Sequence, residues 1–176
     1  MSLFLFETNL QGEKLNKDTV SAKVESIQVK LEENGANLIE VQVAKDFSQL
    51  FFIIETENAE AIHGLLEANE FKVQLQKEVR LVGEDLDRVK EQSEKVNYLV
   101  EWNLPEHLTM EQYLNRKKQN SVHYDEVPEV SFARTYVCED MTKCLCFYDA
   151  PDEAAVKRAR EAVSAPIDAI FELGEK

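Results

Sequence analysis

The sequence repeats itself at a spacing of 94 residues, and this repeat constrains the fold more than any other feature. The stretch LFLFETNL near the N-terminus aligns with NYLVEWNL, so that Leu5 lies over Leu99 and Glu7 over Glu101. The same spacing aligns residues 53–55 with residues 147–149. Identity between the two copies is low, but apolar, turn and charged positions recur together. The chain is therefore expected to contain the same small fold twice.

The first copy has the periodicities of both strands and helices. Apolar residues recur at steps of three or four through the segment 17–33, which predicts a helix that Asn34 and Gly35 end. Two β-rich runs separated by residues 45–48 predict a hairpin. The expected elements, in order, are a strand at 2–10, a helix at 17–33, strands at 37–44 and 49–55, a helix at 58–68 and a strand at 77–83.

The second copy gives the same order of elements. We expect a strand at 97–104, a helix at 109–122, strands at 130–138 and 143–150, a helix at 152–163 and a strand at 168–173. The order βαββαβ is typical of the ferredoxin-like α+β fold, a four-stranded antiparallel sheet with both helices on one face. We therefore predict two tandem ferredoxin-like repeats, residues 1–84 and 96–176, joined by a charged connector at 85–95. Because each sheet has one bare face, the repeats should pack sheet to sheet as an intramolecular pseudo-dimer.

Charge and hydropathy exclude several classes of partner. The 34 acidic residues outnumber the 20 basic residues and give a net charge of −14, so nucleic acid is not expected to bind. No run approaches about 18 apolar residues, so we expect neither a membrane span nor membrane binding. Three cysteines crowded into nine residues form no disulfide framework and suit a reducing compartment. The expected location is the cytoplasm.

One sheet face of the second copy carries the richest chemistry. Strict alternation along the strands places polar and aromatic side chains together on the bare face, where a pocket between the two sheets would bind a small ligand. In this hypothesis Glu101 orients Arg134, Arg134 holds an anion, and the tyrosines pack on the ligand. The candidate ligand-binding residues are Glu101, Arg134, Tyr136, Cys146 and Tyr148.

The residues themselves leave other interpretations open. A paired arginine and glutamate flanked by tyrosines also occurs as the satisfied polar centre of a structural interface. Cys138, Cys144 and Cys146 could hold zinc or nickel, but their spacing is not that of a structural zinc site, and buried cysteines commonly pack as small apolar residues. The three histidines follow no catalytic or metal-binding spacing, and the five glycines form no phosphate loop. No catalytic motif is present, which favours a binding protein over an enzyme.

The second copy also resembles a known family. Its order and spacing over about 75 residues are similar to those of a small ferredoxin-like domain family of unknown function that includes a nickel-binding protein. The resemblance implies a ferredoxin-like α+β fold that associates through its sheets, and binding of nickel or another divalent ion, without identifying the ligands. It rests on Tyr98–Glu101, Leu104-Pro105, Leu108-Thr109, residues 132–140 (FARTYVCED) and residues 146–153 (CFYDAPDE).

These observations lead to two hypotheses on function. The leading one is a non-enzymatic protein that binds a small ligand, or a divalent metal of the nickel type, between its two sheets. The alternative is a small enzyme of the dimeric α/β-barrel kind, a monooxygenase or isomerase without a cofactor motif. The sequence names neither the ligand nor the cofactor, and it leaves self-association of whole chains open.

Overall fold

A computed structural model describes residues 2–10, 15–82, 86, 89 and 96–174. The chain folds into two compact units, which are described separately below. Unit 1 contains Met1–Val79 and Leu173–Lys176, and unit 2 contains Arg80–Glu172. The expected connector at 85–95 lies outside the described residues except at positions 86 and 89, and the expected repeat boundaries stay a prediction.

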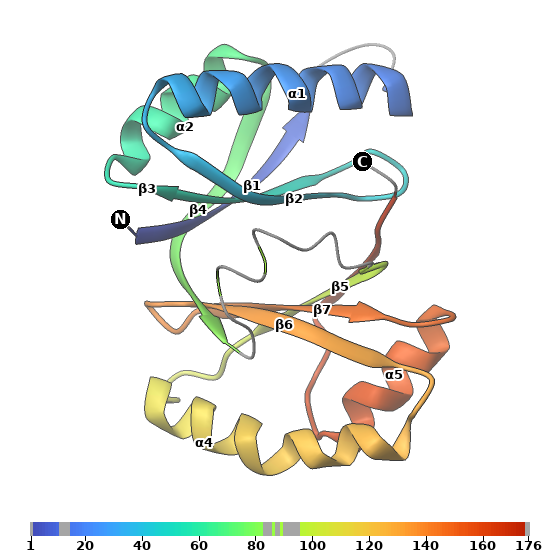
Figure 1. Cartoon of the computed structure of the whole chain (residues 1–176). Helices are drawn as coiled ribbons and strands as arrows, with labels where there is room; N and C mark the ends of the chain where they lie inside the picture. The colour runs from blue at the N-terminus through green and yellow to red at the C-terminus, as the bar shows by residue number, and fades with distance from the viewer. Residues whose placement is uncertain (1, 11–14, 83–85, 87–88, 90–95, 175–176) are drawn as a thin grey trace. The chain divides into compact units, whose positions relative to one another are not determined.

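Unit 1 is a four-stranded antiparallel sheet with two helices on one face (Figure 1). The strand order is β2-β3-β1-β4. A hydrophobic core between the sheet and the helices includes Phe6, Phe52 and Leu31. The elements are β1 (Ser2–Leu10), α1 (Lys17–Glu33), β2 (Asn37–Val43), β3 (Leu50–Thr56), α2 (Ala59–Ala68) and β4 (Phe71–Val82).

The last strand of unit 1 begins earlier than the sequence prediction of residue 77. β4 starts at Phe71, immediately after Glu70, whose φ of 72° turns the chain out of α2. Apolar and polar residues alternate from Phe71 to Gln76, which is the pattern of a strand with one face on the core. The prediction missed this part because the polar side chains outnumber the strongly β-forming ones there.

Unit 2 has the same layout, with two helices on one face of a four-stranded antiparallel sheet (Figure 1). Its strand order is β6-β7-β5-β8. The expected helix at 109–122 is shorter and continues as a 3-10 turn, η1. The elements are β5 (Tyr98–Asn103), α4 (Met110–Asn120), η1 (Ser121–Glu126), β6 (Ser131–Cys138), β7 (Lys143–Asp149), α5 (Glu153–Ala162) and β8 (Ala169–Glu172).

Local capping explains where the helices of unit 2 begin. Thr109 accepts a hydrogen bond from the backbone N–H of Gln112 at 3.1 Å, and the Gln112 side chain accepts one from the Thr109 N–H at 3.0 Å. This capping box starts α4. The Asp152 carboxylate accepts from the Ala155 N–H at 2.8 Å and starts α5. The first turn of each helix is therefore fixed by the side chain of the residue that precedes it.

Both units have the strand order of the ferredoxin-like fold, so the α+β class is confirmed. Duplication of one ancestral unit and packing of the two sheets against each other stay predictions. Within the described part of the chain, no helix combines the length and the apolar character needed to cross a membrane.

Candidate ligand-binding site

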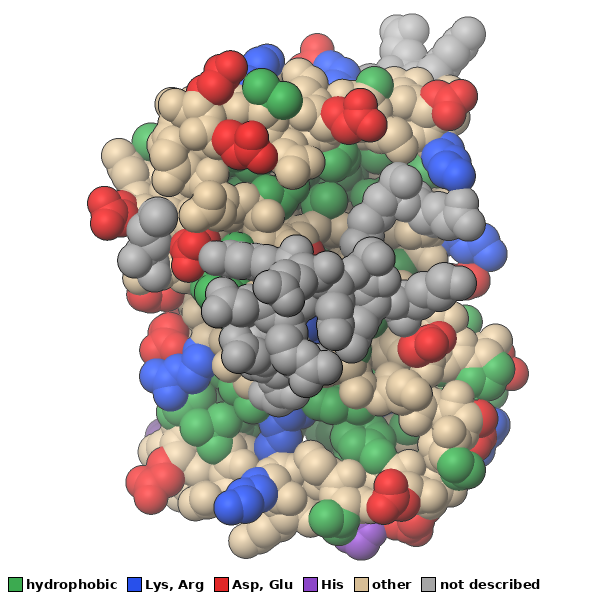
Figure 2. Space-filling model, in the orientation of Figure 1, with side chains coloured by type: hydrophobic (Ala, Val, Ile, Leu, Met, Phe, Trp, Pro, Cys, Tyr) green, Lys and Arg blue, Asp and Glu red, His purple; other side chains and the backbone are tan. Residues whose placement is uncertain are grey.

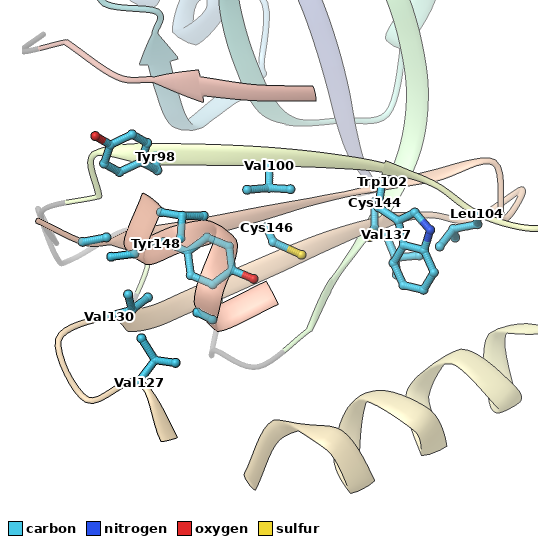
Figure 3. Close-up of a cluster of buried hydrophobic side chains, with 14 of the residues drawn as sticks. Tyr98, Val100, Trp102, Leu104, Val127, Val130, Val137, Cys144, Cys146 and Tyr148 are labelled. Atoms are coloured by element: carbon cyan, nitrogen blue, oxygen red, sulfur yellow. The ribbon is translucent and has the colours of Figure 1, made fainter. Parts of the chain in front are cut away.

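The sheet of unit 2 divides its side chains between two faces, and strand register decides which residue goes to which. On the face covered by the helices, Tyr148 pairs with Tyr98, Cys146 with Val100, and Cys144 with Trp102 across β5 and β7. These residues belong to the hydrophobic core of unit 2. Figure 3 shows the Trp102, Cys146 and Tyr148 side chains on the side of the sheet that faces α4.

This arrangement corrects the expected grouping of the five candidate residues. Cys146 and Tyr148 lie on the helix-covered face, whereas Arg134 and Tyr136 lie on the opposite face with their partners Phe147 and Leu145. The register of the hairpin causes the difference, because it pairs Val137 rather than Cys138 with Cys144. A β-bulge between Phe132 and Arg134 then pairs Phe132 with Tyr148, so Phe132 leaves the face of Arg134.

The expected pair of Glu101 and Arg134 does not form. Glu101 lies on the same face as Arg134, but strand β7 lies between their strands, β5 and β6. Neighbouring strands are about 5 Å apart, so the axes of β5 and β6 are about 10 Å apart. Glu101 instead pairs with Lys143, with 3.3 Å between Oε2 and Nζ. The Arg134 guanidinium lies 5.2 Å from the centre of the Phe147 ring, and Tyr136 meets the same ring edge to face. Ligand binding by Glu101, Arg134 and Tyr136 stays a prediction.

A buried polar cluster lies instead beneath the helices, around Arg160 of α5. Arg160 is 2% exposed. Its Nη1 donates to the Tyr148 hydroxyl at 3.0 Å, and its Nη2 donates to the Pro166 carbonyl at 2.5 Å. The hydroxyls of Tyr148 and Tyr124 are 2.7 Å apart. Arg160, Tyr148 and Tyr124 thus form a continuous hydrogen-bonded chain from α5 through β7 to η1.

Burial and neighbouring groups set the protonation of this cluster. Burial raises the pKa of Tyr124 to about 12 and raises the pKa of Tyr148 well above its usual value, so both hydroxyls are neutral near pH 7. Burial by itself lowers the pKa of Arg160, but the facing Cys146 and Tyr148 groups raise it by more. The guanidinium therefore carries its positive charge inside the unit.

The cysteines support this cluster as packing and hydrogen-bonding groups. The Thr135 hydroxyl donates to the Cys146 sulfur at 3.3 Å. A hydrogen bond from Cys144 lowers the pKa of Cys146 and raises that of Cys144, because the shared proton stays on Cys144. Cys138 points to the other face of the sheet, so the three thiols do not converge. Among the described residues, no three His, Cys, Asp or Glu side chains are arranged to hold a metal ion.

A small pocket with a cavity volume of about 30 Å³ opens beside this cluster, within unit 2. Its walls come from the last turns of α4 and α5, from η1 and from the segment that follows α5, with the Trp102 ring of β5 as one wall. The lining residues are Trp102, Tyr113, Arg116, Lys117, Asn120, Ser121, Tyr124, Arg160, Val163, Ser164 and Ala165.

The charge of this pocket is opposite to that of the chain. Arg116, Lys117 and Arg160 line it, and no acidic residue is among the described residues that do. The Arg116 guanidinium lies over the Trp102 ring at 5.6 Å, and the Lys117 ammonium lies over the Phe132 ring at 4.3 Å. The molecule elsewhere carries many acidic side chains, several of which are visible in Figure 2. The pocket is therefore a cationic, partly aromatic site in an acidic protein.

The sequence reasoning missed most of the pocket residues. The sequence predicts a helix at 152–163, and Arg160 lies four residues after Val156, on the same buried helix face. A charged residue on the apolar face of a predicted helix is unusual, and this was the signal in the sequence that could have identified Arg160. Residues such as Trp102 and Tyr124 come from distant elements, and nothing in their local spacing indicates that they meet.

Solved structures share the fold of the chain at low sequence identity. The crystal structure of "Putative Chlorite dismutase TA0507" aligns with 99% of this chain and 96% of its own, with a TM-score of 0.60 and 13% identity. That of a "putative monooxygenase from Lactobacillus acidophilus NCFM" aligns with 99% and 94%, with a TM-score of 0.53 and 12% identity. Both likenesses show an α+β fold of the dimeric barrel type, and at this identity they show the fold alone.

A family model matches the second half of the chain. No curated protein matches the sequence significantly. Residues 98–173 match the family described as "Nickel responsive protein SCO4226-like". The match covers all of unit 2 from β5 to β8, including every residue that lines the pocket. The resemblance expected from the sequence is thereby confirmed: residues 98–173 are similar to the SCO4226-like family of nickel-responsive proteins.

Proposed function

We propose that unit 2 binds a small molecule in the pocket beside Arg160, and that the protein acts as a binding module rather than as a catalyst. The observation that carries this proposal is the lining of the pocket, which combines aromatic walls with a few convergent charged and polar groups, as small-molecule sites do. Charged side chains are rarely as fully buried as Arg160, which is 2% exposed, unless they are paired. Arg160 also lines the pocket.

The single tryptophan provides a direct test of this function. Trp102 lines the pocket, so a bound molecule should change its fluorescence. We would titrate the full chain with 4-tert-butylbenzoate and with its neutral analogue 4-tert-butylbenzamide, which are rigid probes of nearly the same shape. Saturable quenching by at least one probe is expected.

Two matched leucine substitutions locate the binding. Ala165 lines the pocket, and Ala165→Leu should fill part of it and weaken probe binding at least tenfold. Ala154 is exposed on α5, away from the lining, and Ala154→Leu should leave binding unchanged. The proposal fails if neither probe binds, or if Ala165→Leu binds as tightly as the unaltered chain.

A second candidate function is binding of a divalent metal such as nickel. The description of the matching family as nickel responsive favours it. The described residues do not fit such a role, because they include no cluster of three metal-ligating side chains, and we assign no ligands. Calorimetry with Ni²⁺ at 0.15 M salt would support this function if about one ion per chain binds. Binding that disappears at this salt would instead reflect diffuse attraction to the charge of −14.

A third candidate is the small cofactor-independent enzyme considered from the sequence. It is favoured only by the fold shared with the proteins called a chlorite dismutase and a monooxygenase, and a shared fold does not carry a shared reaction.

A further inference from the structure

The Arg160 guanidinium has a donor that nothing in the described part of the chain accepts. Its Nε is buried and has no hydrogen-bond partner, while Nη1 and Nη2 donate to Tyr148 and Pro166. No described carboxylate pairs with Arg160. A buried donor without an acceptor costs free energy, so a group that supplies the acceptor should bind favourably. Arg160 lines the pocket, which is where such a group would enter.

The tyrosine chain delivers a second donor to the same pocket. The Tyr148 hydroxyl accepts from Arg160 and lies 2.7 Å from the Tyr124 hydroxyl. We infer the arrangement in which Tyr148 donates its own proton to the Tyr124 oxygen. The Tyr124 hydroxyl hydrogen is then free for a ligand, because Tyr124 lines the pocket whereas Tyr148 lies behind it. Tyr124 and Arg160 are therefore two hydrogen-bond donors in the pocket lining, connected to each other through the Tyr148 hydroxyl.

We propose that the ligand of this pocket is a small apolar carboxylate, whose carboxylate group meets Arg160 and Tyr124 and whose apolar body lies against Trp102 and Tyr113. This inference rests on the proposed function. An ionised carboxylate only accepts hydrogen bonds, and the charged groups of the lining only donate them. Arg116 and Lys117 add positive charge at the pocket and increase the attraction for an anion.

The surroundings favour one negative charge over several. The pocket lies at the last turns of α4 and α5, and helix C-termini carry partial negative charge. Asn120 and Arg160 mark these last turns in the lining. Phosphate sites commonly use helix N-termini or glycine-rich loops, and no glycine lines this pocket among the described residues. A monoanionic carboxylate therefore fits better than a phosphate dianion.

Arg160 has a structural role that the test must separate from ligand binding. It lies in the last turn of α5, where a cation offsets the helix dipole, and its bond to the Pro166 carbonyl holds the following segment. A merely structural Arg160 would stabilise unit 2 but would not distinguish a charged ligand from a neutral one. Selectivity for charge is thus the informative measurement.

The experiment compares three probes that share a 4-tert-butylphenyl body on the full, unaltered chain by Trp102 fluorescence. These are 4-tert-butylbenzoate, the neutral 4-tert-butylbenzamide and the dianionic 4-tert-butylphenyl phosphate. We expect the benzoate to bind at least tenfold more tightly than the benzamide, and more tightly than the phosphate. Equal binding of benzoate and benzamide would overturn the inference and leave the proposed function intact. Binding of none of the probes would remove the proposed function itself.

Matched arginine variants then assign the selectivity to one residue. Arg160→Met should reduce the preference for benzoate over benzamide to less than threefold, while benzamide still binds. Arg158→Met is the control on the same helix, because Arg158 pairs with Glu129 at the surface, and it should keep the full preference. If Arg160→Met keeps the preference, the carboxylate is not held by Arg160. If that variant does not fold, the comparison of probes on the unaltered chain still decides the inference.

Discussion

At the scale of single residues, the buried hydroxyl of Tyr124 shows how unit 2 stabilises polar groups in its interior. Tyr124 is stacked on Phe132 with the rings 5.3 Å apart, and its hydroxyl contacts that of Tyr148. Burial raises its pKa from 10.0 to about 12, so the folded chain holds this proton more tightly than the unfolded chain. The resulting stability is complete below pH 10 and is lost as the pH rises through 12.

This difference predicts a measurable effect of Tyr124→Phe in alkaline solution. Between pH 10 and 12 the free energy of unfolding of the unaltered chain should fall by on the order of 2 kcal/mol more than that of the variant. Denaturant unfolding at several pH values would measure both slopes. The variant also lacks the hydrogen bond of the Tyr124 hydroxyl, and this lowers its free energy of unfolding by the same amount at every pH. That loss shifts one curve against the other but leaves both slopes unchanged. Parallel curves over this range would contradict the prediction.

At the scale of elements, helix α4 positions much of the pocket. It carries Tyr113, Arg116 and Lys117, and its first turn depends on the capping box of Thr109. The backbone N–H of Tyr113 donates to the Thr109 carbonyl at 2.9 Å, so fraying at the cap reaches a pocket residue directly. Stability of this helix end and affinity of the pocket should therefore change together.

We predict that Thr109→Ala lowers the free energy of unfolding by about 1 kcal/mol and also weakens binding of 4-tert-butylbenzoate. Asn58→Ala is a matched control, because Asn58 caps α2 of unit 1 by accepting from the Ala61 N–H at 3.1 Å. It should cost about the same stability and leave the affinity unchanged. Denaturant unfolding and Trp102 fluorescence measure the two quantities. Equal affinity in both variants would show that the cap does not position the pocket.

At the scale of the whole molecule, each unit has a hydrophobic core of its own. The core around Phe52 and Leu31 belongs to unit 1, and the core around Val100 and Tyr148 belongs to unit 2. A ligand that binds only the folded form of unit 2 stabilises that unit by mass action, by about 2.7 kcal/mol at one hundred times its dissociation constant. We therefore expect the two units to respond differently to the ligand.

Hydrogen exchange of the full chain would measure this response. Saturating 4-tert-butylbenzoate should slow exchange in α4, η1 and α5, by up to about a hundredfold for amides that exchange through opening of unit 2. Exchange in α1 and α2 should not change. Equal slowing in both units would mean that they open together, which contradicts the prediction.

The sequence by itself determined the order and type of the elements and, through them, the α+β class. Helix and strand periodicities, the Asn34-Gly35 helix end and the Thr109 cap are local features, and local spacing is sufficient to recognise them. The resemblance of residues 98–173 to a family was likewise readable from short segments. The prediction began six residues late at the start of β4, where polar side chains outnumber the strongly β-forming ones.

Only the tertiary structure decided which residues share a site. The hairpin pairs Val137 rather than Cys138 with Cys144, and this places Arg134 on the face opposite Tyr148, because side chains alternate along a strand and a shift by one exchanges the faces. The pocket joins Trp102, Tyr124 and Arg160 from three separate elements. These three residues come together because of how the helices pack on the sheet. The spacing of residues within a single element cannot predict that packing.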